Sequence, residues 1–448
     1  MYVLYIQTAA LILESIFCSS RACSAFIPNH VDRFNVSSCF PSNRKVWRLR
    51  PAQLHRISDA AMDATKGKFD FSWILFLLAH TIYLLGVSVK PSPYRWLLFI
   101  PFGSICTYLT YYTSLRDPVG DYGMGAYLMT QFFTALDFLI LTDVQKELKL
   151  VGQKDGVADK PLKTRLVWGL KLLGSPRGIG WTYAPTSILP TPSKPSTTRR
   201  QFIVSRLSEL AANVLLYDLN GFVIRANPCM KVDGPSFWHT GNGWMWMWRA
   251  AGLSYTVAAW ININVLHILY SLLSVGLGST EPQEWTPLFG RLWDAHTVRR
   301  FWGRVWHQMM RRLLSKNVDL VSKTLGLPRR NRITEFFCLF LAFFISAVIH
   351  GAGDAMMLTN WRQGGSFLFF ALQPFAIALE EMVMSLGRRM SISGNSTTVK
   401  MLGLLWAFLW FSNTLPIVID IKARRGFFQA GPQGSVFLSL VRGEWTPK

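Results

Sequence analysis

Long apolar runs alternate with basic, polar stretches along most of this chain, and the pattern predicts a protein built from membrane helices. A helix needs about 20 apolar residues to cross the hydrocarbon core of a bilayer. Runs near that length predict helices over residues 73–89, 95–113, 124–141, 202–224, 243–274, 333–349, 367–386 and 401–421. The predicted fold class is therefore an all-α integral membrane protein, a multi-pass helical bundle of about seven to nine membrane helices.

The polar stretches divide the chain into consecutive parts. A short apolar run near the N-terminus could be a signal peptide or a first anchor, and a long basic loop, which its Lys and Arg residues place in the cytoplasm, separates two groups of membrane helices. In order, the parts are residues 1–61 (extension), 62–142 (N-terminal membrane helices), 143–201 (basic cytoplasmic loop), 202–284 (middle membrane helices), 285–425 (expected catalytic region) and 426–448 (basic tail).

Basic residues also predict which loops share one side of the membrane. The loops at 143–201, 286–332 and 387–400 can all lie in the cytoplasm if an even number of crossings separates them. The last helix then leaves Lys422, Arg424 and Arg425 on the opposite side, against the rule. Either that helix is re-entrant or one predicted span is wrong.

Composition favours lipid as the solvent of this protein. Half of the residues are hydrophobic (50%), only 16% are charged, and there are 18 Trp and 31 Phe. A formal net charge of +22 would suggest nucleic-acid binding in a soluble protein. Here the basic residues lie in loops between apolar runs, so we expect lipid and no nucleic acid as the partner. The 6 cysteines show no zinc-site spacing, and no metal is expected.

Residues 285–312 are rich in both Trp and Arg and predict an amphipathic helix at the membrane interface, capped by Asp294. On such a helix Trp302 and Trp306 lie on an apolar arc. The opposite arc carries basic groups at helical spacing, namely Arg300, Arg304, His307 and Arg311. These arginines could meet lipid headgroups only, or they could grip phosphates, for which the guanidinium fork is well shaped.

A few polar groups inside the apolar runs are the strongest candidates for chemistry, because such groups are costly in a membrane. His350 lies at the far end of the 333–349 run, with Ser346 one turn before it. A neutral imidazole can take a proton from an alcohol, although a helix-end histidine can also simply bind a carbonyl. Asn264 and His267 recur at helical spacing in another run, where they could join helices or face a substrate.

Two motifs resemble a known family. The segment PLFGRLWDAHTVRRFWGRVWHQMMRR, followed by a membrane helix carrying a histidine, is similar to the signature of the wax-synthase-like branch of the membrane-bound O-acyltransferases. SPRGIGW, residues 175–181, resembles a second element of that family. Thr297-Val298-Arg299 stands where the family commonly has Ser-Leu-Arg.

The resemblance implies an acyl-CoA-dependent O-acyltransferase. Catalysis would fall to the membrane-helix histidine, His350, with His307 as its rival. Arg300, Arg304 and Arg311 would pair with coenzyme A phosphates. Trp302 and Trp306 would stack on adenine, while Asn264, His267 and Ser346 would line the reaction chamber. Fungal members of this type often transfer acetyl to terpenoid or meroterpenoid hydroxyls, and long-chain wax or sterol ester synthesis is the alternative.

The remaining expectations concern the setting of the reaction. Acetyl-CoA or another acyl-CoA is the expected co-substrate, with no bound cofactor, and a lipophilic alcohol is the acceptor. The expected location is the endoplasmic reticulum membrane. Alternatives of other classes are a multi-pass metabolite transporter and a non-catalytic scaffold. The sequence does not fix the oligomeric state.

Overall fold

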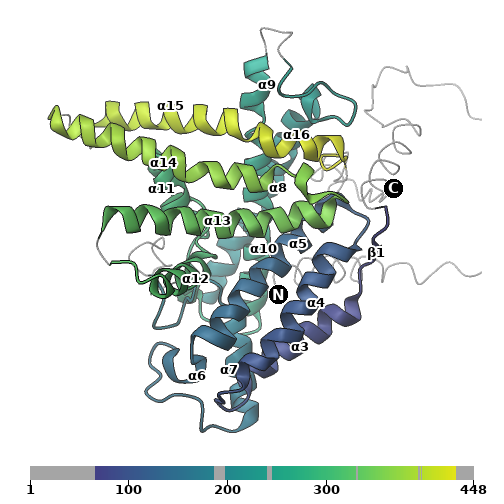
Figure 1. Ribbon diagram of the computed structural model, residues 1–448, viewed down its shortest axis with the longest axis vertical. Coiled ribbons are helices and arrows are strands. Elements are labelled where there is room, and N and C mark those ends of the chain that lie inside the picture. Colours follow the sequence, from purple (N-terminus) through teal and green to yellow (C-terminus); the bar gives the residue numbers. More distant parts are fainter. Residues whose placement is uncertain are drawn as a thin grey trace, which may run out of the picture.

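A computed structural model describes residues 66–185, 197–239, 245–328, 331–391, 394 and 396–429. The expected extension, residues 1–61, and most of the tail, residues 426–448, lie outside these described residues. Apart from a parallel pair of two-residue strands, β1 (Phe69–Asp70) and β2 (Thr113–Ser114), the described regular structure is helical (Figure 1).

The helices follow the apolar runs. In order they are α3 (Trp73–Ser88), α4 (Phe99–Tyr112), α5 (Pro118–Ala135), α6 (Val144–Glu147), α7 (Leu162–Leu173), α8 (Arg199–Ala226), α9 (Met245–Ala251), α10 (Ser254–Gly276), α11 (Val298–Arg300), α12 (Arg311–Thr324), α13 (Arg332–Met357), α14 (Ser366–Arg389), α15 (Thr397–Thr414) and α16 (Pro416–Arg424). Among the described residues, 6 helical stretches are long and apolar enough to cross a membrane, and α3 is a shorter apolar helix. The predicted fold class, a multi-pass helical membrane protein, is confirmed.

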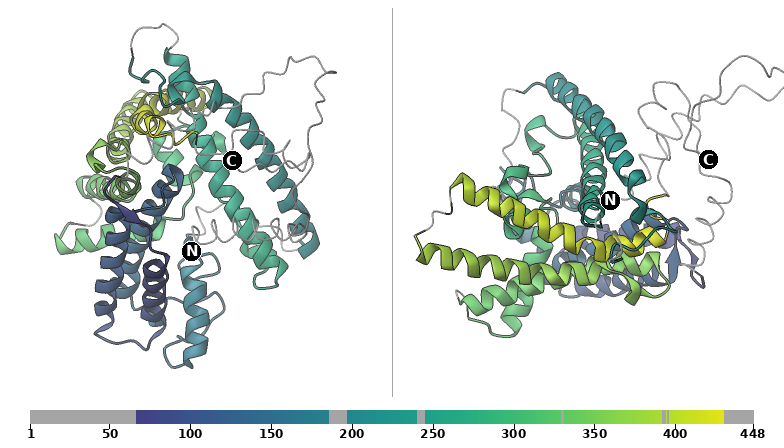
Figure 2. Two further views of the ribbon diagram at one scale, coloured as in Figure 1. Left: turned by 90° about the vertical axis from the view of Figure 1, so that its right-hand side faces the viewer. Right: turned by 90° about the horizontal axis from the view of Figure 1, so that it is seen from above.

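Helix α13 is the shared wall of the bundle. It packs against α5 on one side and α14 on another, and it also contacts α12 (Figure 1). Helices α8 and α10 pair with each other and lie to one side of this group (Figure 2). A side chain near the C-terminal half of α13 is therefore placed between several elements distant in sequence.

Glycines allow α5 and α13 to approach closely. A Cβ on Gly125 of α5 would collide with the backbone oxygen of Ala352, and one on Gly353 of α13 would collide with Tyr122. Only residues without a Cβ permit this contact. The close crossing brings Tyr122 next to His350.

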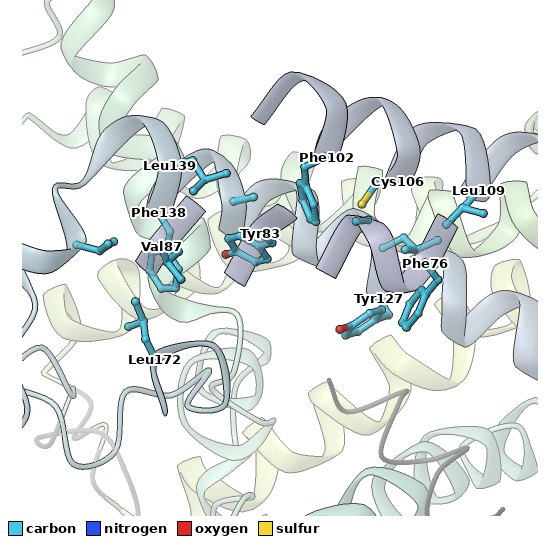
Figure 3. Close-up of a cluster of buried hydrophobic side chains, with 14 of the residues drawn as sticks. Phe76, Tyr83, Val87, Phe102, Cys106, Leu109, Tyr127, Phe138, Leu139 and Leu172 are labelled. Atoms are coloured by element: carbon cyan, nitrogen blue, oxygen red, sulfur yellow. The ribbon is translucent and has the colours of Figure 1, made fainter. Parts of the chain in front are cut away.

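A cluster of buried apolar side chains holds α3, α4 and α5 together (Figure 3). The rings of Tyr83 and Phe102 lie 4.9 Å apart in it, and Met356 of α13 belongs to the same cluster. Dense packing of this kind resists small displacements. The cluster therefore fixes α5 against α13, where the candidate chemistry lies.

Several predicted boundaries differ from the structure. The helix expected to end at residue 349 continues to Met357, because Gly351 and Gly353 pack inside the bundle rather than stopping the helix. The basic loop 143–201 is not free of structure: it contains α7, whose Gly169 packs on Ser88 of α3. The run 243–274 is interrupted between α9 and α10, and Pro416 begins a separate last helix.

The cations that conflicted with the topology rule turn out to have protein partners. The ammonium of Lys422 is only 1% exposed and lies 2.9 Å from the Asp354 carboxylate of α13. Arg424 donates to the backbone oxygens of Val232 and Gly234, and Arg425 donates to a Gln363 oxygen. The rule counts loop charges, so these paired groups do not require a cytoplasmic loop.

Candidate active site

The expected single amphipathic helix over residues 285–312 is wrong. Helix α11 begins at its N-cap Thr297, a π-helical turn η7 (Phe301–Val305) follows, and Trp306 is extended at φ −70° and ψ 150°. Helix α12 begins only at Arg311, so the predicted basic arc is split between two elements. Asp294 is not the cap: it lies in the preceding 3₁₀ turn and binds Arg300.

Side-chain amides explain why the helix breaks there. The Nε2 group of Gln308 donates to the carbonyl oxygens of Trp302 and Trp306 at 3.0 and 2.7 Å. The N–H of Gly290 donates to Val305 O at 2.9 Å. Backbone groups that leave a helix need such partners, and here Gln308 and the PLFG turn supply them.

Acidic and amide groups of α14 anchor the same segment. The Glu380 carboxylate accepts the N–H groups of Val298 and Arg299 at 2.5 and 3.1 Å, and the indole N–H of Trp406 at 2.8 Å. The Gln373 oxygen accepts from Trp302 Nε1 at 3.2 Å and from Trp410 at 3.1 Å. These hydrogen bonds fasten the FWGR turn to α14, and the same two α14 side chains also bind α15.

The SPRGIGW element binds the WTPLFG turn, which precedes the FWGR segment in the sequence. The Arg177 guanidinium, 6% exposed, donates to the carbonyl oxygens of Thr286 and Pro287 at 2.9 and 2.8 Å. Gly178 and Gly180 have φ of +67° and +81°, a backbone conformation that favours glycine. The two sequence motifs, about 110 residues apart, are thus joined directly.

A cavity of about 1110 Å³ extends from the FWGRVWHQ segment to α13. At one end its lining side chains are exposed and charged, among them Arg299, Asp319, Lys323 and Glu335. At the other end it reaches His350 and Phe370 inside the bundle. The cavity therefore connects a charged entrance to the half-buried imidazole of His350.

His350 is held by an aromatic ring and a phenol. Its ring stacks on Phe370 with centroids 4.1 Å apart and planes at 7°. Its Nδ1 lies 3.2 Å from the hydroxyl of Tyr122 in α5. Ser346, one turn earlier on α13, lines the same cavity. With Nδ1 engaged, Nε2 is the nitrogen left for a substrate.

His307 lines the same cavity as His350. Burial lowers its pKa to about 3, with further contributions from His350 and Arg177. Among the described residues no hydrogen-bond partner is found for its buried Nδ1 atom. At neutral pH His307 is thus uncharged and has a ring nitrogen available.

The other predicted site residues divide into two groups. Trp302, Trp306 and Arg311 line the cavity together with both histidines. The remaining residues are not among those that line it. Arg300 is paired with Asp294 at 3.0 Å, Arg304 is exposed, Asn264 binds Glu209 of α8 at 3.1 Å, and His267 Nε2 contacts Thr286 O at 3.2 Å.

Sequence reasoning missed Tyr122, Arg299 and Lys323. Tyr122 lies just outside the predicted 124–141 run, and nothing local in the sequence marks its approach to His350. Gly125, which packs against Ala352 of α13, is a signal of a close helix crossing in this region, but it does not point to Tyr122 itself. Within the described part of the chain, no cluster of three or more His, Cys, Asp or Glu could hold a metal ion.

Residues 285–372 match the membrane bound O-acyl transferase family. The chain is 34% identical over 384 residues to acetyltransferase ple2 of Rhodocybe pseudopiperita, an alignment that covers 84% of this chain and 98% of the relative. This chain belongs to the membrane bound O-acyl transferase family. It is 31% identical over 367 residues to acetyltransferase eriL of Hericium erinaceus, covering 81% of this chain and 94% of that one.

The predicted resemblance and the prediction of an acyltransferase enzyme are confirmed. A third relative, acetyltransferase pyr8 of Aspergillus fumigatus, is 27% identical over 308 residues, or 65% of this chain. The family match spans α11, α12 and α13 and ends in α14. In this membrane bound O-acyl transferase both histidines, and all the cavity-lining residues except Ile377, lie within the matched region.

Proposed function

We propose that this enzyme transfers an acetyl group from acetyl-CoA to a hydroxyl of a lipophilic acceptor, a terpenoid or meroterpenoid secondary metabolite. The observation that carries the proposal is the cavity joining the FWGRVWHQ segment to His350. The relatives' names, acetyltransferase ple2 and acetyltransferase eriL, support acetyl as the transferred group. We place the reaction in the endoplasmic reticulum membrane.

The charged end of the cavity would receive the nucleotide portion of the donor. Arg311, Arg299 and Lys323 line it, and a guanidinium can bind a phosphate with two hydrogen bonds. Trp306 lines the next part of the cavity and offers an aromatic face. Arg300 and Arg304 are expected from the sequence to share this task. Arg300 would contribute only if its ion pair with Asp294 rearranged, and Arg304 only from outside the cavity.

His350 would act as the general base. Its Nε2 would take the proton of the acceptor hydroxyl while the alcohol oxygen forms a bond to the thioester carbonyl carbon. When the carbon–sulfur bond breaks, the imidazolium would return that proton to the coenzyme A sulfur, giving the acetate ester and free thiol. Positioned proton transfer of this kind contributes about 10²–10⁴-fold to a rate.

His307 would assist from the donor side. A neutral imidazole with a free ring nitrogen can donate to the thioester oxygen as negative charge develops there. Its position beside Trp306 in the wall of the cavity favours contact with the donor rather than the acceptor. The rival assignment, with His307 as base, is decided by the experiment below.

Membranes containing the enzyme would be assayed with labelled acetyl-CoA and a panel of terpenoid alcohols. We expect His350→Gln to lower kcat by about 10²–10⁴-fold. The exposed His239→Ala, outside the cavity lining, is the matched control and should retain full turnover. Full turnover in His350→Gln together with its loss in His307→Gln would transfer the role of base to His307.

Two further experiments test which residues bind the acyl-CoA donor and which acyl chain length the enzyme uses. Arg311→Ala should raise KM for acetyl-CoA, and a larger rise in Arg300→Ala or Arg304→Ala would move the phosphate site to those residues. Competition between acetyl-CoA and palmitoyl-CoA tests the long-chain alternative. Preferred use of palmitoyl-CoA would identify a wax or sterol ester synthase instead.

A further inference from the structure

A chain of polar side chains runs behind His350, away from the cavity. Tyr122 of α5 lies 3.2 Å from His350 Nδ1, and its hydroxyl lies 3.4 Å from Ser366 Oγ at the start of α14. Ser366 Oγ in turn donates to Asp354 Oδ1 at 3.0 Å, and its backbone N–H donates to Oδ2 at 2.8 Å. The chain therefore ends on a buried carboxylate one turn of α13 beyond the histidine.

The carboxylate of Asp354, at the far end of this chain of side chains, is held in position and kept ionised by a buried ion pair. Lys422 of α16 lies 2.9 Å from Asp354 Oδ1, and both side chains are 3% exposed or less. The same ammonium lies 3.4 Å from the centre of the Tyr122 ring. A buried carboxylate with its counter-ion is an acceptor only. Because Asp354 can only accept, the hydroxyl next to it in the chain donates toward it, and this fixes the orientation of the hydroxyl after that.

The direction follows link by link. The Ser366 hydroxyl lies within hydrogen-bond distance of both the Asp354 carboxylate and the Tyr122 hydroxyl, but it has only one proton to donate. The bond to Asp354 is the shorter, 3.0 against 3.4 Å, and its acceptor is charged, so we assign the proton to the carboxylate and leave the Ser366 oxygen to accept from Tyr122. The Tyr122 proton then points to Ser366, so the phenol oxygen accepts from its other two neighbours, the Tyr255 hydroxyl and His350 Nδ1–H. A neutral imidazole carries a single N–H. A proton on Nδ1 leaves a lone pair on Nε2, the form that a base facing the cavity requires.

We propose that Tyr122, Ser366 and Asp354 are positioning residues that fix the tautomer of His350. This inference rests on the proposed function, in which His350 is the base. The chain also orients the imidazolium formed during the reaction, because its Nδ1–H keeps an acceptor throughout. Tyr122 and Ser366 touch no reacting atom in this scheme.

The test is a double-mutant cycle in kcat. Tyr122→Phe removes one hydroxyl beside His350, and Ser366→Ala removes one that never contacts the histidine. We expect each to lower kcat by about 10–100-fold, the range found when the outer hydrogen-bond partner of a metal-bound histidine is lost, with KM for both substrates unchanged. Because both act through one proton direction, the double variant should be no slower than Tyr122→Phe alone.

Tyr127→Phe is the matched control, since Tyr127 lies on the same helix and binds His80 instead, at 2.8 Å. It should retain kcat. Additive losses in the cycle, unchanged kcat in Tyr122→Phe, or a loss confined to KM would each overturn the inference. Ser366→Ala serves alone if Tyr122→Phe does not fold. Full activity of His350→Gln would instead refute the proposed function, so the two failures are distinguishable.

Discussion

At the scale of single residues, His307 shows how burial keeps an imidazole uncharged. Its folded-state pKa of about 3 lies below the ordinary 6.5. Between these values the unfolded chain binds a proton that the folded protein does not. The stability due to this group is therefore present above about pH 6.5 and is lost as pH falls toward about 3.

This gives a prediction for acid stability. In detergent, the Tm of the wild type should fall between about pH 7 and about pH 4, and His307→Gln should show a shallower fall over the same range. The quantity to measure is the difference between the two curves, which removes the contributions of other groups. Parallel curves would contradict an uncharged, buried His307.

Gly290 is a second single residue on which the structure depends, because the absence of a side chain there lets the PLFG turn contact the FWGR segment. A Cβ at this position would collide with the Arg304 carbonyl oxygen, which is backbone and cannot move aside easily. We predict that Gly290→Ala lowers the free energy of unfolding by about 1–3 kcal/mol. Thermal unfolding in detergent is the measurement.

Gly123→Ala is the control for that substitution. A Cβ there meets nothing within 4 Å, and the residue lies inside α5. Since alanine favours a helix over glycine, this variant should be as stable as the wild type or more so. Equal destabilisation of both variants would mean that the collision at Gly290 is relieved without cost.

At the scale of elements, apolar run length predicted the long helices well but not their ends. The chain passes through Gly351 and Gly353 in helical form because tertiary packing, of Gly351 against α14 and of Gly353 against α5, outweighs their low helix propensity. The break of the helix at Trp306 could not be predicted because a side chain elsewhere in the segment, rather than the residue's own helix propensity, causes it. Its carbonyl is satisfied by Gln308, a partner that helical periodicity does not reveal.

The short helix α11 depends on a carboxylate from another element. Glu380→Ala would leave the Val298 and Arg299 N–H groups and the Trp406 indole without that acceptor, at about 1–3 kcal/mol for a buried group. We predict a lower Tm and faster proteolysis of the FWGR segment. Both can be followed on the purified protein.

The neighbouring Glu381→Ala is the comparison. Glu381 pairs with Arg299, whose side chain is 53% exposed, and exposed pairs contribute about 0–1 kcal/mol. Its Tm should stay near that of the wild type. If the Glu381 variant were the less stable one, the anchoring of α11 would have to be reassigned.

At the scale of the whole molecule, the basic loop is joined to the segment that precedes the cavity-lining residues. Arg177 joins it to the WTPLFG turn with two hydrogen bonds to carbonyl oxygens. We predict that Arg177→Lys, which keeps the charge but not the planar fork, lowers activity and increases proteolysis within residues 143–185. The exposed Lys171→Ala on α7 should change neither. Normal protease resistance in Arg177→Lys would show that the fork is dispensable.

The site as a whole could be predicted only in part. Trp302, Trp306, His307 and Arg311 could be identified because they lie in one contiguous polar and aromatic segment, and His350 because it is an ionisable group at the end of an apolar run. Tyr122, Ser366 and Lys422 could not, since each comes from a different helix and only packing brings it to α13. The partner of a buried charge is a property of the assembled bundle.

The Lys422–Asp354 pair also bears on how the protein is made. A lone Lys or Asp in a spanning helix is costly, by about 2.5–3.5 kcal/mol at the helix centre on insertion scales, and by less in the last turn, where Asp354 and Lys422 lie. Asp354 is synthesised first and has to remain without its counter-ion until the last helix emerges. Membrane integration of α13 and of the α15–α16 stretch is thereby coupled, and a ribosome that stops short of residue 422 would leave a carboxylate stranded in the bilayer.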